Sequence, residues 1–224
     1  MVYIPPGTFE MGKADRYDAA PPHRVTFEQG FCIDRTEVTV GAYGKCVQAG
    51  ACTPCRKSVY CNVAGEEPDD HPQNCIDWPQ ARAFCVWAGK RLTSDAEWEY
   101  AARGSNGREF PWGNEPPDNA RIHWSGGGGP RVFGTAPVGS HPGDVSPFGV
   151  LDMAGNVSEW VEVDPKKAAP SDRAVRDDVR PVRGTSWGNG LEPAPAWRRL
   201  LMSYFAGQVA QSSSRGLRCA SPAQ

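Results

Sequence analysis

Alternating hydrophobic and polar residues predict short strands in the first part of the chain. The run "MVYIPPGTFEMG" predicts two strands joined by a Pro-Pro-Gly turn, which is a hairpin, and "HRVTFEQGFCIDRTEVT" predicts two more strands around Gly30. Thr39 then has the side chain of an N-cap for a helix over 40–49, which Gly50 would end. The rest of this region, 50–75, is rich in Cys, Pro and acidic residues and predicts an irregular loop.

Helical spacing is clearest in the next thirty residues. Between Asp77, a candidate N-cap, and Gly89 the apolar residues recur at i, i+3, i+4 and i+7: Ala81, Phe84, Cys85 and Ala88. Ser94 and Glu97 have the spacing of a capping box for a second helix, and one face of it is apolar: Trp98, Ala101 and Ala102. After Gly104 the pattern predicts only turns and short strands. We therefore expect one α+β domain over 1–224, with low regular secondary structure, short strands and about three helices; only the polar stretch 165–178 could be a linker.

Composition excludes several kinds of partner. The formal net charge is −2, the isoelectric point is near 6.1 and the mean hydropathy is −0.52. No basic excess favours nucleic acid or an anionic membrane, and no apolar run has the roughly 20 residues of a membrane span. The 25 Gly, 21 Pro and 8 Trp residues indicate a loop-rich chain with large aromatic anchors.

The cysteines favour an oxidising compartment. There are 8 of them, clustered in loop-like sequence except for the last, Cys219. Such usage is typical of exported proteins, so we expect an extracytoplasmic location, periplasmic or at the cell surface, with reduced thiols in the cytoplasm as the alternative. Strand-like sequence begins at Val2, so we expect no signal peptide here and interpret the chain as a domain of a larger exported or membrane-anchored protein.

Eight motifs occur in the order found in formylglycine-generating enzymes: "MVYIPPGTFEMG", "IDRTEVTVGAY", "WPQARAFCVWAGKRLTSDAEWEYAARG", "FPWGN", "GTAPVG", "FGVLDMAGNVSEWVEV", "VRGTSWG" and "RGLRCA". The chain resembles the sulfatase-modifying-factor family from its start to about residue 220, with gaps at 50–70 and 165–178. The resemblance implies a compact α+β domain related to C-type lectin folds. Sulfatase activators, sulfoxide synthases, kinase fusions and variable proteins of diversity-generating retroelements share this domain, so fold alone does not settle function.

The resemblance also implies a disulfide between Cys85 and Cys219. For the other six cysteines we hypothesise that Cys46 pairs with Cys52 and Cys61 with Cys75, which leaves Cys32 with Cys55. Spacing does not fix this connectivity. The Cys52-Thr-Pro-Cys55 motif leaves other interpretations open: a zinc site completed by Cys61 and Cys75, a redox-active pair, or free thiols.

Copper chemistry in the family needs two cysteine thiolates about five residues apart, because soft thiolates suit Cu(I). Counting back from Cys219 places this pair at Pro195 and Leu200, and counting forward from Trp187 places it at Ala194 and Arg199. Neither register contains sulfur. We therefore predict no copper and no catalytic residues of the copper-dependent kind.

The family's iron-dependent branch uses three histidines, mostly on an additional helical domain. The four histidines of this chain are scattered and mostly flanked by proline: His23, His71, His123 and His141. We expect them to be surface or core residues and predict no iron.

The segment "DMAGNVSEW" resembles the family's structural calcium loop. The implied ligands are oxygens, as Ca²⁺ prefers: the carboxylates of Asp152 and Glu159 and the carbonyls of Gly155 and Val157. The alternative is a Gly-Asn turn with a solvated Glu159. A second family calcium site is expected to be lost, because Arg121 and Pro130 occupy its ligand positions.

A cluster of large side chains falls in the segment that lines the family's substrate groove: Trp197, Arg198, Arg199, Tyr204 and Phe205. Four other tryptophans, Trp112, Trp124, Trp160 and Trp187, are expected mainly to pack, with Trp187 also bordering the groove. Aromatic and guanidinium groups are typical of binding hot spots. The alternative is that Leu200, Leu201 and Phe205 fill the space of the lost copper site.

We therefore expect a non-catalytic domain that binds a peptide, protein or small ligand through a remodelled C-terminal groove. One alternative is an oxidoreductase-type enzyme of the same family with unidentified chemistry. Another is a diversity-generating-retroelement variable protein, against which the single Asn within 183–218 counts.

Overall fold

The computed structural model describes residues 1–14, 19–125, 132–164, 166–168, 179–188, 195–203 and 211–223, and for Ser203 the backbone only. Its helices are α1 (Val40–Gln48), α2 (Trp78–Trp87) and α3 (Asp95–Arg103). Its strands are β1 (Val2–Ile4), β2 (Gly7–Met11), β3 (His23–Phe27), β4 (Phe31–Ile33), β5 (Arg91–Leu92), β6 (Ser158–Trp160), β7 (Val179–Arg183), β8 (Arg199–Ser203), β9 (Arg215–Leu217) and β10 (Cys219–Pro222). This is the mixed α+β domain with short strands that the sequence predicts.

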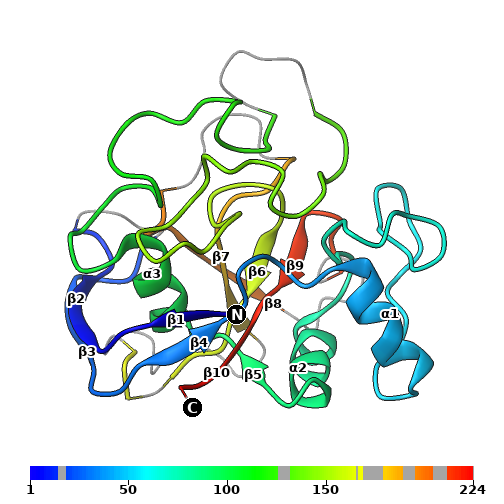
Figure 1. Ribbon diagram of the computed structural model, residues 1–224, viewed down its shortest axis with the longest axis horizontal. Helices are drawn as coiled ribbons and strands as arrows, with labels where there is room; N and C mark the ends of the chain where they lie inside the picture. Colours follow the sequence, from blue (N-terminus) through cyan, green and yellow to red (C-terminus); the bar gives the residue numbers. More distant parts are fainter. Residues whose placement is uncertain are drawn as a thin grey trace.

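The strands form three small sheets. Their orders are β1-β4-β10-β5, β2-β3 and β8-β7-β6-β9. The β6–β9 pair is parallel and every other strand pair is antiparallel. In Figure 1 the helices and strands occupy the lower part of the molecule, and the green to yellow-green segment between α3 and β6 forms long loops above them.

The predicted hairpin in "MVYIPPGTFEMG" is wrong, although both of its strands exist. β1 pairs with β4 and β2 pairs with β3, so the two strands belong to different sheets. Pro5 and Pro6 lack the N–H groups that a tight hairpin would use, and they carry the chain from one sheet to the next. Gly7 then packs so closely on Tyr100 that a Cβ atom there would lie 2.1 Å from the tyrosine oxygen.

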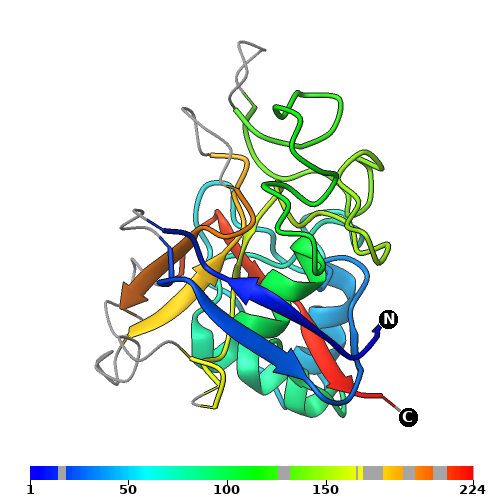
Figure 2. The same cartoon turned by 90° about the vertical axis from the view of Figure 1, so that its left-hand side faces the viewer.

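The three helices begin where their capping residues predict. Thr39 caps α1 by accepting from the amide of Ala42, and Asp77 and Ser94 form complete capping boxes at the starts of α2 and α3. The pattern of the helix predicted after Ser94 indicated one apolar face, but every residue of that helix, α3, is buried. α3 is therefore an interior helix, and in Figure 2 the blue strands near the N-terminus pass in front of the green helices.

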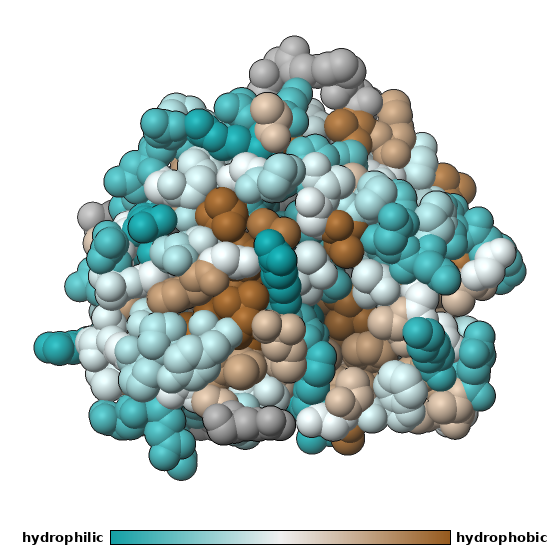
Figure 3. All heavy atoms as spheres, in the orientation of Figure 1, coloured by the Kyte–Doolittle hydropathy of each residue, from teal (hydrophilic) through white to brown (hydrophobic). Residues whose placement is uncertain are grey.

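Two main hydrophobic clusters form the core, and α3 contributes residues to the first of them. The first contains aromatic rings of β2, β3, β4 and α3 that pack against one another in stacked and tilted pairs: Phe9, Phe27, Phe31 and Tyr100. The second surrounds the disulfides of α1 and α2 and includes Tyr43, Phe84 and Trp160. On the face shown in Figure 3 the hydrophobic residues lie in separate groups divided by hydrophilic ones. Among the described residues, no helix is long and apolar enough to cross a membrane.

Three of the four hypothesised cysteine pairs are present. They are Cys46–Cys52, Cys61–Cys75 and Cys85–Cys219, so Cys219 ties the last strand to α2 as the family resemblance implies. The fourth hypothesised pair is wrong, because Cys32 and Cys55 are free thiols.

The two free cysteines occupy different environments. Cys32 lies opposite Tyr3 and Ser221 in the middle of a sheet, on the face away from the buried Phe31 and Ile33. Cys55 lies in the irregular loop, where its thiol donates to the carbonyl of Asn62 and burial raises its pKa. Cys52, its partner in the Cys-x-x-Cys motif, is already bonded to Cys46, so the motif forms neither a redox pair nor a four-thiolate zinc site.

Removing the disulfide that closes the longest loop should cost the most stability. Cys85 and Cys219 are 134 residues apart, whereas Cys46 and Cys52 are 6 apart. Loop-closure entropy predicts a loss of about 5 kcal/mol for Cys85→Ala/Cys219→Ala and about 2 kcal/mol for the control Cys46→Ala/Cys52→Ala. Urea unfolding of the two double variants measures this difference. Equal losses would show that the long closure does not restrict the unfolded chain.

Candidate functional site

A buried ion pair forms the base of the loop that was predicted to bind calcium. Arg218, between β9 and β10, donates from Nε to Oε2 of Glu159 at 2.7 Å and from Nη2 to Oε1 at 2.7 Å. Trp98 of α3 donates to the same Oε2 at 2.8 Å. Burial works to lower the pKa of Arg218, but the charges of Glu159, Glu37 and Asp152 outweigh it and raise that pKa. Glu159 is therefore not the solvated residue of the alternative interpretation.

Further carboxylates surround this pair. Asp152 accepts from the amide of Gly139 at 2.6 Å, and Asp144 accepts from the amide of Ala154 at 2.8 Å. Burial raises the pKa of Asp144 to about 8 and, together with the charge of Asp152, raises that of Glu37 well above its usual value. One oxygen of Glu37 and one of Asp144 are buried without a hydrogen-bond partner.

This arrangement fits a calcium ion only in part. Both oxygens of Glu159 already accept hydrogen bonds, so the ion would have to share this carboxylate with Arg218 and Trp98. In the part of the chain that the structure describes, no group of three or more His, Cys, Asp or Glu side chains is arranged to hold a metal. Calcium at Asp152, Gly155, Val157 and Glu159 stays a prediction. For the second calcium site, Arg121 pairs with Glu115, and Pro130 lies outside the described residues.

The positions of the family's copper-binding thiols lie beside a second buried charge network. Leu200 is opposite Val182 in the β7–β8 pair, and Arg199 is opposite Arg183. Both guanidinium groups reach the start of α3: Arg199 Nε lies 2.7 Å from Oδ2 of Asp95, and Arg183 binds the other oxygen of Asp95. Arg183 also lies 2.9 Å from Glu99. Arginine–carboxylate pairs therefore occupy the region where one counting register would place a thiol.

The predicted groove residues are not all brought together. Trp197 is 4% exposed and donates to Glu109, and Arg199 is 6% exposed, so both lie in the interior. Of the residues that the core-filling alternative names, Leu200 is half-buried but Leu201 is 48% exposed, so Leu201 does not fill an interior space. Arg198 is half-buried and bridges to Ala19. Tyr204 and Phe205 lie outside the described residues. Of the set, Trp187 is the one that meets exposed aromatic side chains.

Two histidines that are distant in the sequence are neighbours in the structure. The rings of His123 and His141 lie 5.4 Å apart, which corrects the expectation that all four histidines are scattered. Burial lowers the pKa of His123, and the nearby His141 and His71 lower it further. His123 Nε2 donates to the carbonyl of Gly134, and His71 bonds Thr135, so these rings hold the loop around 134–136.

An exposed aromatic cluster, formed by Tyr60, Phe133 and Trp187, is the feature that the sequence did not reveal. The rings of Tyr60 and Phe133 are stacked with centroids 6.2 Å apart, and Tyr60 meets Trp187 edge-on at 5.2 Å. Tyr60 is 45% exposed and Phe133 is 64% exposed, whereas Trp187 is 8% exposed and forms the floor. Tyr60 comes from an irregular loop and Phe133 follows a glycine run, so neither has a periodic pattern that could have predicted this meeting.

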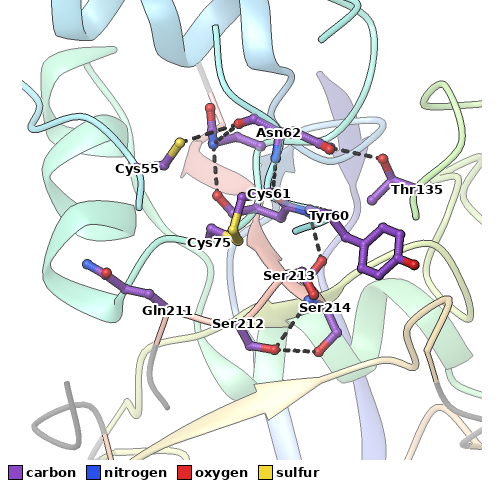
Figure 4. The surroundings of a disulfide bond; sticks show 12 residues. Cys55, Tyr60, Cys61, Asn62, Cys75, Thr135, Gln211, Ser212, Ser213 and Ser214 are labelled. Carbon is purple, nitrogen blue, oxygen red and sulfur yellow. Dashed lines mark hydrogen bonds between the residues drawn. A yellow bond between two sulfur atoms is a disulfide. The ribbon is translucent and has the colours of Figure 1, made fainter. Parts of the chain in front are cut away.

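A buried polar network holds this cluster in place (Figure 4). Asn74 is completely buried and its amide nitrogen donates to the carbonyls of Tyr60 and Ser213, at 2.9 and 2.7 Å. Its oxygen accepts from the amide of Asn62 at 2.6 Å. The indole of Trp187 donates to the carbonyl of Ser213 as well, and the Cys61–Cys75 disulfide holds the residue that follows Tyr60 in the chain. The aromatic cluster is therefore anchored at its base while its upper rings face solvent.

The fold and the site define the class of protein. Short strands around a central helix, long loops, and the Arg218–Glu159–Trp98 contact describe an α+β domain of the formylglycine-generating-enzyme type, related to C-type lectins. The chain belongs to the sulfatase-modifying factor enzyme 1-like domain family, whose model matches residues 1–223.

Relatives in this family differ in activity. The chain is 36% identical over 157 residues to inactive C-alpha-formylglycine-generating enzyme 2 of Bos taurus, covering 66% of this chain and 49% of that protein. It is 33% identical over 214 residues to formylglycine-generating enzyme of Mus musculus, covering 71% and 57%. The chain thus spans about half the length of these relatives. The solved structure of PvdO from Pseudomonas aeruginosa superposes with a TM-score of 0.77 at 27% identity, covering 99% of this chain and 93% of that one.

Truncating Asn74 tests whether the polar network anchors the aromatic cluster. Asn74→Ala leaves the carbonyl of Tyr60 and the backbone amide of Asn62 without their partner, while the carbonyl of Ser213 keeps its hydrogen bond from Trp187. A buried unsatisfied polar group costs about 1–3 kcal/mol, so we expect a loss of at least about 2 kcal/mol in the free energy of unfolding, measured in urea. The control Asn106→Ala, at an exposed position, should change it by less than about 0.5 kcal/mol. A loss no larger than the control's would contradict the anchoring role.

Proposed function

We propose that this chain is a non-catalytic member of its family that binds a peptide, protein or small ligand. The observation that carries the proposal is the exposed but firmly anchored aromatic cluster of Tyr60, Phe133 and Trp187. Rigid aromatic groups supply contact area at a low cost in conformational entropy, and they dominate binding energetics at protein surfaces. The proposed binding surface therefore consists of Tyr60, Phe133 and Trp187, whereas Trp197 and Arg199 lie in the interior.

The residues at the family's thiol positions support a non-catalytic function. Pro195 and Leu200 have no metal-binding atom, and Arg199 is committed to Asp95 in the interior. Similarity to a relative named as inactive agrees with this proposal. Similarity to a formylglycine-generating enzyme supports the alternative, a catalytic chain. The copper and iron content of the purified chain distinguishes this alternative from the non-catalytic proposal.

The compartment follows from the disulfides. Three disulfide bonds in a chain of 224 residues indicate an oxidising environment. We propose an extracytoplasmic location, where a binding domain would meet its ligand directly.

Metal analysis of the purified chain tests the loss of catalysis. We expect less than about 0.1 copper or iron per chain after exposure to Cu(I) or Fe(II), because the paired thiolates that select Cu(I) are absent. The variant Pro195→Cys/Leu200→Cys restores two thiols at the family spacing and should gain copper. Stoichiometric copper or iron in the unaltered chain would contradict the proposal. The same measurement tests calcium, expected at about one ion per chain.

Selection from a random peptide library tests binding by the aromatic cluster. We expect peptides with a shared apolar or aromatic anchor residue, and we expect Tyr60→Ala/Phe133→Ala to weaken their binding by at least about tenfold because two hot-spot rings are lost. The control Tyr3→Ala removes a similarly exposed ring, 54% exposed, on the outer face of a different sheet. Equal binding by the cluster variant and the unaltered chain, measured by calorimetry, would exclude this cluster as the site.

A further inference from the structure

A cavity of about 510 Å³ lies at the opposite end of the domain from the long loops. It opens where α2, β5, the start of α3 and the segment after β6 meet. Figures 1 and 2 show α2 and the yellow segment that follows β6 at the lower end of the molecule, below the loops that include Phe133. The cavity therefore lies apart from the aromatic cluster.

Most of the charged groups in its wall are already paired. Arg91 binds Glu97 through two parallel contacts, and Glu97 also closes the capping box of α3 with Ser94. Lys167 pairs with Asp164 at 3.4 Å and lies 5.3 Å above the ring of Phe27. These pairs give the cavity firm walls and leave little of their charge for a ligand.

Two charges of opposite sign are left over. Within the described part of the chain, neither Glu162 nor Arg82 forms an ion pair or a side-chain hydrogen bond, although the two groups interact electrostatically. Arg82 extends from α2 one turn before Val86, and Glu162 lies two residues after β6, so two different elements bring these charges to the cavity wall. Burial raises the pKa of Glu162, and the charges of Arg180 and Arg82 partly offset that rise. The carboxylate is thus partly removed from water without a partner of its own.

The cavity wall that holds these two charges also has apolar side chains. Leu92 and Val163 line it together with Val86 and the ring of Phe27. A cavity of this size holds a molecule of a few hundred cubic ångströms. A ligand that fits must carry a cationic group and an anionic group at its ends and an apolar body between or beside them.

We propose that this cavity binds a small zwitterion, a free amino acid or short peptide with an apolar side chain. Glu162 would accept from its ammonium group and Arg82 would donate to its carboxylate. The apolar side chain would rest on Leu92, Val163 and Phe27. The neutral overall balance of the wall, three basic and three acidic side chains, favours a zwitterion over a net cation or anion.

Calorimetry with L-leucine and leucyl-leucine tests the site on the intact chain. We expect saturable binding, with N-acetyl-leucine and leucinamide at least about tenfold weaker, because each blocks one charged end. Glu162→Gln and Arg82→Gln should each weaken leucyl-leucine binding by at least about tenfold. Two exposed residues away from the cavity supply matched controls: Glu67, and Lys45 of α1. Glu67→Gln and Lys45→Gln should leave leucyl-leucine binding unchanged.

Two results would overturn this proposal. One is the absence of saturable binding up to about 10 mM, well above the dissociation constant of a weak millimolar site. The other is equal binding of the blocked and unblocked ligands. Tyr60→Ala/Phe133→Ala must retain leucyl-leucine binding, because a loss there would assign the ligand to the aromatic cluster. A lack of leucyl-leucine binding at this cavity therefore does not contradict the proposed function of the aromatic cluster. A lack of peptide binding at the aromatic cluster likewise does not contradict the proposal for the cavity.

Discussion

The bidentate contact between Arg218 and Glu159 is the interaction on which the rest of the domain depends. Arg218 also donates to four carbonyls, those of Asp34, Arg35, Leu151 and Asp152, so one side chain joins the end of β4, the long loops, β6 and the last strand. A chain with few long helices or strands must satisfy its buried backbone oxygens in some other way. Here one buried guanidinium does so, and Glu159 supplies the charge that keeps the guanidinium in the interior.

A second arginine network joins β7 and β8 to α3, and one of its members, Arg199, stands where one counting register would place a thiol. Arg183 and Arg199 converge on Asp95 and Glu99 of α3. Removing one partner from such a network would leave a buried charge uncompensated, which costs several kcal/mol. The arrangement therefore gives Arg183 and Arg199 a structural role, because they fix β7 and β8 against α3. Trp197 has a similar structural role, because its buried indole donates a hydrogen bond to Glu109.

The sequence predicted local elements well and long-range meetings poorly. Caps such as Ser94 with Glu97 act within one turn, so their residues suffice to predict them, and short-range disulfides such as Cys46–Cys52 follow the same rule. The pairing partners of β1 and β2 are β4 and β3, which lie further along the chain, and the Pro-Pro-Gly turn between β1 and β2 does not specify them. The pairing of Cys32 with Cys55 failed for a related reason: it was inferred by elimination, and β4 holds Cys32 within a sheet. Family resemblance located Trp187, but Tyr60 and Phe133 come from loops without periodicity, and only the three-dimensional structure brings them onto it.

The same physical principle explains why both candidate binding sites lie where they do. Many charged and polar side chains in the interior of this domain are already paired with one another. Side chains that can still contact a ligand therefore lie at the edges of these polar networks. At one end the Asn74 network uses its hydrogen bonds on backbone groups and leaves aromatic rings facing solvent. At the other end the capping box of α3 consumes Glu97 and Arg91 and leaves Glu162 and Arg82 unmatched. Buried polar contacts thus add to the two hydrophobic clusters in fixing the fold, and the exposed aromatic rings and the two charges at the cavity are the groups that remain available for recognition.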